Sequence, residues 1–217
     1  MAITVYTYND KVLKNVATDK WLKKPEGPIY PTLADYSLRA KFTSGYDPTT
    51  DTSGAPLVSA TQIDAVNNVW DITMSSDYFG SPTTGGRSNW KSNLIELLDM
   101  NCGDKTNIGS MFQHYTALTN VGLFDSSGIT VMTAVFMGCT SLTTIPLFNT
   151  SNVTDMSAMF SGCTNVESGA LALYQQASTQ TTPPSTHTDT FKNCGSNTVT
   201  GAAELAQIPT SWGGTAS

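Results

Sequence analysis

Length, composition and charge exclude several classes of protein for this chain. It has 217 residues, of which 39% are hydrophobic and 13% charged, and 11 Lys and Arg stand against 17 Asp and Glu, a formal net charge of −6. Nucleic-acid binding requires clustered cations that displace counterions, so the charge argues against it. No run approaches the roughly 18 to 20 apolar residues that span a bilayer. The start, MAITVYTYNDK, lacks a basic segment followed by an apolar one, so no secretory signal is predicted.

Residues 1–32 are predicted to form a β-hairpin followed by a proline-rich linker, and to act as a docking segment. Apolar and polar residues alternate in ITVYTY, and Asn9-Asp10 offers a turn. The stretch KKPEGPIYPT has the composition of a stiff linker. Basic residues crowd this part of the chain and are the expected docking contacts: Lys11, Lys14, Lys20, Lys23 and Lys24.

Residues 33–91 are predicted to be a β-rich N-terminal cap. In one segment Leu38, Ala40 and Phe42 alternate with polar residues, which is typical of a half-buried strand. The segment VWDITM repeats the pattern with Trp70 and Ile72.

Residues 92–217 contain a 24-residue repeat, which is the strongest signal in the sequence. The motif F-x-x-C occurs at Phe136 and again at Phe160, and a looser copy follows about seven inserted residues that include Pro183 and Pro184. The columns predicted to form the repeat core are Phe112, Phe136, Phe160 and Phe191; Cys139, Cys163 and Cys194; and Leu94, Leu118 and Leu142.

Each copy is predicted to be one turn of a solenoid, with a short strand and a short helix. Residues 142–148 have strand-like spacing of apolar residues. Thr154 and Asp155 suit a helix N-terminus, Met156 and Phe160 then share one helical face, and Gly162 suits the end. The expected fold class is an α+β repeat: a short leucine-rich-repeat-like solenoid with an N-terminal β region. A single copy buries too little apolar surface to fold alone, so the copies must stack.

The recurring cysteines are predicted to fill one interior position in successive turns as free thiols. A disulfide between stacked turns is the alternative, and Tyr115 in the equivalent position one turn earlier argues against it. The spacing does not favour zinc. At the other end of the repeat, helices are expected over residues 168–177 and 201–208, and Trp212 is expected to fold back over the last turn as a cap or, alternatively, to act as a ligand platform.

The repeat SNVTDMSAMFSGCTNV and its neighbour GITVMTAVFMGCTSLTTIPLF resemble the BspA-like surface leucine-rich repeats over about residues 92–200. The departures are a strand one residue shorter than the usual leucine-rich spacing and Tyr115 in place of a cysteine. The resemblance implies binding and display rather than catalysis, because such arrays occur in bacterial surface adhesins and in virion proteins of phages that infect gut bacteria.

Catalytic and metal-binding patterns are weak. His114 and His187 fall at structural positions of the repeat, and no G-x-S-x-G elbow or P-loop is present. The carboxylates of Glu96, Asp99 and Asp104 could serve glycoside cleavage, but a solvated rim is the simpler explanation. One column could bind calcium or satisfy turn backbone groups: Asn101, Asp125 and Asn149.

The sequence therefore leaves two alternative functions. In the first, the chain is a non-enzymatic virion protein of a phage, a fibre or decoration protein of head or tail. Its N-terminal segment docks on capsid or tail proteins, and its repeats adhere to a host surface protein or glycan. This protein is expected to have no cofactor and to form a homo-oligomer, preferably a trimer. In the second, it is a bacterial cell-surface adhesin.

Overall fold

The computed structural model describes residues 7–8, 11–12, 32–52, 57–77, 79, 88–122 and 124–216. The chain divides into two units, Met1–Thr32 and Leu33–Ser217. In the first unit β1 (Thr7–Tyr8) pairs antiparallel with β2 (Lys11–Val12), as the predicted hairpin requires. The predicted proline-rich linker lies outside the described residues, apart from its last residue.

The second unit begins with a five-stranded sheet in the order β4-β5-β3-β6-β7. Its first four strands are antiparallel, whereas β7 runs parallel to β6. The bounds are β3 Ser37–Phe42, β4 Leu57–Asp64, β5 Val69–Met74, β6 Leu94–Asn101 and β7 Asn120–Val121. Short 3-10 helices are η1 Pro48–Thr50, η2 Trp90–Ser92 and η3 Thr210–Trp212.

The sheet joins the predicted cap region to the first copy of the repeat. Leu38, Ala40 and Phe42 are buried in β3 as predicted, but Ser37 and Arg39 are buried too, so the strand is not half-buried as the alternation predicted. The same strand pairs with β6, where Leu94 begins the repeat. The expected boundary between residues 91 and 92 therefore falls within one compact unit.

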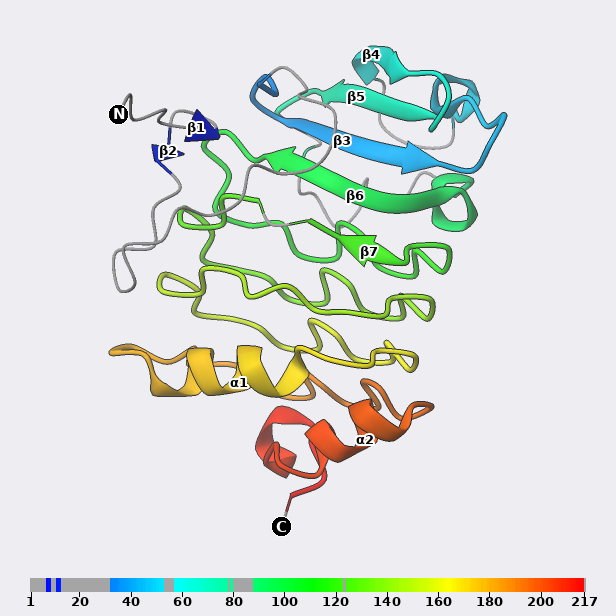
Figure 1. Ribbon diagram of the computed structural model, residues 1–217. Helices are drawn as coiled ribbons and strands as arrows, with labels where there is room; N and C mark the ends of the chain where they lie inside the picture. The colour runs from blue at the N-terminus through cyan, green and yellow to red at the C-terminus, as the bar shows by residue number, and fades with distance from the viewer. Residues whose placement is uncertain are drawn as a thin grey trace, which may run out of the picture. The chain divides into compact units, whose positions relative to one another are not determined.

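After β7, segments 24 residues apart hydrogen-bond to one another. Figure 1 shows them side by side between β7 and α1. The main-chain N–H groups alternate between two kinds of acceptor. Those of Ala134 and Phe136 donate to carbonyls of the next segment, whereas those of Val135 and Met137 donate to the carbonyl three residues earlier in their own segment. Isolated parallel bridges continue the pairing, for example between Val131 and Asp155.

This alternation corrects the predicted strand and helix of each copy. Residues 142–148 contain a single bridge at Thr144 instead of a strand, and residues 156–162 form consecutive turns instead of a helix. A helix would use every N–H within its own segment. Here Ala158 and Gly162 adopt left-handed backbone angles, with φ of 55° and 76°, which break the helical path and release every second N–H to the neighbouring segment.

Two helices follow the third copy, near the positions predicted for them. Helix α1 spans Ala170–Thr179 and helix α2 spans Val199–Leu205. Trp212 is 5% exposed and its ring packs against those of Phe191, Tyr174 and His187. The structure is thus of the mixed α+β class that the sequence predicts. Neither helix combines the length and apolar character needed to cross a membrane, within the part of the chain that the structure describes.

Candidate binding surface

The predicted core columns lie in one continuous buried cluster. The rings of Phe112 and Phe136 stack with centroids 5.6 Å apart, those of Phe136 and Phe160 at 5.4 Å, and those of Phe160 and Phe191 at 6.2 Å. A separate predicted column consists of leucines that are fully buried: Leu94, Leu118 and Leu142. These residues position the outward-facing side chains of each segment but are not themselves available to a partner.

The cysteines are free and buried, among the residues that the structure describes. The thiol of Cys139 donates to the carbonyl of Phe112 at 3.1 Å, and that of Cys163 donates to the carbonyl of Phe136 at 3.0 Å. Burial raises the pKa of Cys163 to about 12 and those of Cys139 and Cys194 well above the ordinary value. Protonated thiols of this kind suit core packing and not nucleophilic chemistry.

Threonines recur at one position of successive segments of the repeat, exposed at Thr106, Thr154 and Thr186 and half-buried at Thr130. We call Thr106, Thr130, Thr154 and Thr186 the threonine row. The hydroxyls of Thr130, Thr154 and Thr186 each donate to the carbonyl of the preceding row member, at 3.2, 3.1 and 3.2 Å. Because each hydroxyl hydrogen is used in this way, the oxygens of these three side chains remain as acceptors for a partner.

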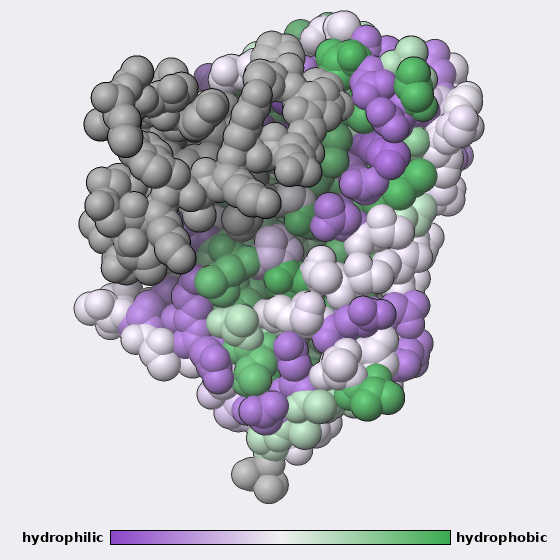
Figure 2. All heavy atoms as spheres, in the orientation of Figure 1, coloured by the Kyte–Doolittle hydropathy of each residue, from purple (hydrophilic) through white to green (hydrophobic). Residues whose placement is uncertain are grey.

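A second, shorter set repeats the arrangement at Thr119 and Thr143, whose hydroxyls donate to the carbonyls of Ile95 and Thr119. Hydrophilic, near-neutral and hydrophobic residues are interspersed on the face seen in Figure 2. Regular polar groups with few charges are suited to hydrogen bonding with a neutral polar partner.

One column of side chains accepts hydrogen bonds from turn backbone groups: Asn101, Asp125 and Asn149. Each side-chain oxygen accepts a hydrogen bond from the backbone N–H two residues later, at 3.0, 3.1 and 3.0 Å. No group of three or more His, Cys, Asp and Glu side chains is arranged to hold a metal ion in the described ranges. The turn explanation therefore accounts for the column that could have bound calcium.

Asp155, predicted to begin a helix, instead orders a turn. Its carboxylate accepts a hydrogen bond from the backbone N–H of Ser157 at 2.8 Å. Partial burial raises the pKa of Asp155, but hydrogen bonds from Ser157 and Thr133 outweigh it, so the pKa is lowered overall.

The candidate catalytic carboxylates have separate structural partners. Glu96 pairs with Lys41 at 2.9 Å, Asp99 accepts from the backbone N–H of Met100, and Asp104 accepts from the Tyr36 hydroxyl. The two histidines have different environments. His187 stacks on Trp212 with ring centroids 4.1 Å apart, whereas His114 is an exposed residue with φ of 62°.

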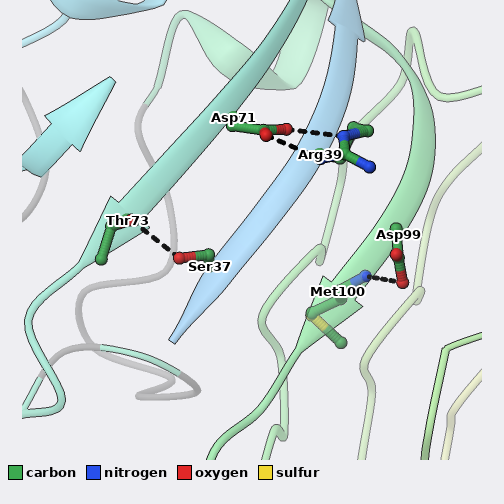
Figure 3. A network of polar contacts seen from close by, with 6 residues as sticks. All are labelled: Ser37, Arg39, Asp71, Thr73, Asp99 and Met100. Carbon is green, nitrogen blue, oxygen red and sulfur yellow. Dashed lines mark hydrogen bonds and ion pairs between the residues drawn. The ribbon is translucent and has the colours of Figure 1, made fainter. Parts of the chain in front are cut away.

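A polar network on the sheet was not anticipated (Figure 3). Arg39 of β3 forms a two-point ion pair with Asp71 of β5, with both N–O distances 2.6 Å and the Arg39 side chain 5% exposed. Beside it the hydroxyls of Ser37 and Thr73 are 2.7 Å apart. Alternation in both strands, with opposite charges on the polar positions, is the signal that could have revealed this pair. It fixes the register of β3 against β5.

The side chains of the predicted docking lysines lie outside the described residues. Only the backbone of Lys11, in β2, is described; the other four are Lys14, Lys20, Lys23 and Lys24. Docking by these residues stays a prediction.

Comparison with known proteins finds a family match for the repeat region. Residues 106–194 match the family model described as Mycoplasma protein of unknown function, DUF285. No curated protein and no solved structure matches the chain. The family match covers the side-by-side segments from Thr106 to Cys194 and is consistent with the resemblance to BspA-like surface repeats.

Proposed function

We propose that the bonded segments are turns of a leucine-rich-repeat-like solenoid and that the protein is a non-enzymatic display scaffold of a phage virion. In this proposal it is a head or tail fibre or decoration protein, located on the virion surface, that adheres to a host-cell surface protein or glycan. The observation that carries the proposal is the threonine row, whose hydroxyls are oriented by the preceding segment.

The chemistry of the row favours a glycan. Adjacent strands in a sheet lie about 4.8 Å apart, and the row members are bonded across neighbouring segments in the same way. A row of fixed acceptors at that interval matches a partner that presents repeated hydroxyl donors. Prior orientation also lowers the entropy lost on binding, because these side chains are already held in one rotamer.

The rest of the proposal concerns assembly. The basic N-terminal segment would contact capsid or tail proteins, and a symmetric base would favour a homo-oligomer. The absence of catalytic roles is supported by the structural contacts that engage His187, Glu96 and Asp104.

Two experiments test the proposal. Mass spectrometry of purified phage particles should detect the chain at a fixed copy number, and its absence would reject the virion role. In a glycan array, labelled full-length protein should bind, and the triple variant T130V/T154V/T186V should lose at least about tenfold in affinity, since valine keeps the shape but removes the acceptors. The matched control, T116V/T140V, changes two exposed threonines outside both sets and should bind as the wild type does.

A bacterial cell-surface adhesin is the second candidate. The family model's description refers to Mycoplasma, a bacterium, which favours this alternative. Labelling of intact bacterial cells with an antibody against the repeats, together with absence from phage particles, would support it over the first proposal.

A further inference from the structure

Strand β4 forms one edge of the five-stranded sheet. It pairs with β5 on one side, and no other strand among the described residues pairs with its second side. Its exposure fits an edge strand, since Val58, Ser59, Thr61 and Gln62 are exposed. An edge strand presents unpaired N–H and C=O groups that can bond to another strand.

The middle of β4 lacks the usual protection of a sheet edge. Proteins block edges with lysine, proline, β-bulges or inward-facing charge. The stretch Leu57–Ile63 reads LVSATQI, without charge or proline and with the β-branched residues that favour strands. Register shifts occur near both ends of β4, but between them Ser59–Gln62 pairs regularly with residues 70–73 of β5. Four consecutive residues therefore present a regular, neutral edge.

The hairpin that carries this edge is held in shape at its tip. The Asp64 carboxylate accepts hydrogen bonds from the backbone N–H groups of Val66 and Asn67, both at 3.0 Å, and from the Asn67 side chain at 2.8 Å. Two of the most exposed large hydrophobic side chains belong to this hairpin: Val58 is 66% exposed and Val66 is 94% exposed. A pre-ordered hairpin with exposed apolar residues loses little entropy when it binds.

We propose that two copies of this protein associate through β4, edge to edge and antiparallel, which extends the sheet across both copies. A second copy fits because an identical edge supplies matching donors and acceptors without any sequence requirement. Charge also favours it: each chain carries a net −6, yet the paired stretch Leu57–Ile63 is neutral, so no like charges meet within it. This inference is independent of the proposed adhesive role.

The pairing predicts two copies and not the trimer expected from fibre analogy. An antiparallel pair of identical strands has two-fold symmetry and uses each edge once, so the contact closes at two copies.

Light scattering coupled to size-exclusion chromatography on the full chain tests the proposal. Wild-type protein should shift with rising concentration toward twice the 23.1 kDa chain mass. The double variant Ser59→Lys/Thr61→Lys puts two positive charges on the paired stretch of each copy, so the two edges repel one another and self-association should weaken by at least about tenfold. The matched control Thr140→Lys/Thr188→Lys adds the same charges to exposed threonines of the repeat and should associate as the wild type does.

Hydrogen exchange gives a readout that does not depend on the variants folding. Amides of β4 in the wild type should gain protection as protein concentration rises, whereas those of β5 should not change. The proposal would be overturned by a wild-type mass of one chain at the highest soluble concentration, or by a trimer. It would also be overturned by a dimer that the double lysine variant leaves unaffected and that shows no concentration-dependent protection of β4.

Discussion

The ring of Phe160 lies 5.4 Å from that of Phe136, with the two planes inclined by only 15°. Both side chains are fully buried although 24 positions separate them. The contact therefore exists only when neighbouring segments are in register, and each ring contributes to the stability of two segments.

Replacement of Phe136 by alanine should lower the free energy of unfolding by about 3 to 5 kcal/mol, because it leaves a cavity between stacked rings. Urea denaturation followed by circular dichroism would measure the loss. Leu147→Ala is the control, since that side chain is 51% exposed and its loss should cost less than about 0.5 kcal/mol. A loss below about 1 kcal/mol for Phe136→Ala would contradict the stacked core.

Gly138 and Gly162 form a matched pair, because both have left-handed φ angles, 72° and 76°. A Cβ at Gly162 would meet nothing closer than 3.7 Å, so Gly162→Ala should cost only the backbone strain, about 1 to 2 kcal/mol. A Cβ at Gly138 would overlap the His114 ring. Gly138→Ala should therefore cost more in urea denaturation.

A double-mutant cycle separates the two causes. In the His114→Ala background the ring is absent, so Gly138→Ala should cost about as much as Gly162→Ala does in the wild type. An unchanged cost in that background would show that the ring does not limit the space at Gly138.

Much of the fold could be predicted because apolar periodicity reflects burial directly. The 24-residue period identifies which side chains share a position, and alternation in Leu38, Ala40 and Phe42 predicts strand β3. The helices predicted over 168–177 and 201–208 lie close to α1 and α2, although α2 carries Gly201 in its interior.

The turn structure within each copy could not be predicted in this way. The spacing of Met156, Met159 and Phe160 buries the same side chains in a helix and in consecutive turns. The residue that decides between them is Ala158, and alanine gives no signal of its left-handed angle because it is the best helix former. The pairing of β3 with β6 was missed for another reason: it depends on contacts between distant segments, which periodicity does not encode.

The four cysteines should resist modification in the folded protein. Burial raises the pKa of Cys102 and Cys163 to about 12, so at pH 8 these thiols are protonated as well as inaccessible. Iodoacetamide labelling read by mass spectrometry should modify none of the four in native buffer and all four in concentrated urea. Rapid labelling of Cys139 or Cys163 under native conditions would show that the core position is open.

Asp155 should make stability depend on pH in the acidic range. Its pKa is lowered in the folded state, so its contribution is present above the unfolded pKa, about 3.9, and disappears as pH falls through the lower folded value. Asp155→Asn should thus destabilise the protein at pH 7, and the difference from wild type should shrink as pH falls below about 4. Ser157→Ala removes the hydroxyl that also donates to Asp155 and keeps the backbone N–H, so it should reduce the same pH dependence in denaturation curves. A difference that is constant from pH 7 to pH 3 would reject the assigned hydrogen bonds as its source.

Helix α1 depends on a carboxylate from another part of the chain. The residue that caps its N-terminus, Gly169, has no side chain to accept the free N–H groups. Glu204 of α2 accepts instead from the N–H groups of Gly169 and Leu171, at 3.3 and 3.0 Å. Glu204→Gln keeps an acceptor but loses the attraction of the charge to the helix dipole, so it should cost about 0.3 to 1 kcal/mol. Glu204→Ala loses both and should cost about 1 to 2 kcal/mol.

Thermal unfolding at low and high salt would separate these contributions, because salt screens the charge and leaves the hydrogen bonds. The control Glu167→Gln removes the same charge at an exposed position and should be nearly neutral. Equal effects of Glu204→Gln and Glu167→Gln would mean that net charge, and not the contact at the start of α1, determines the change in stability.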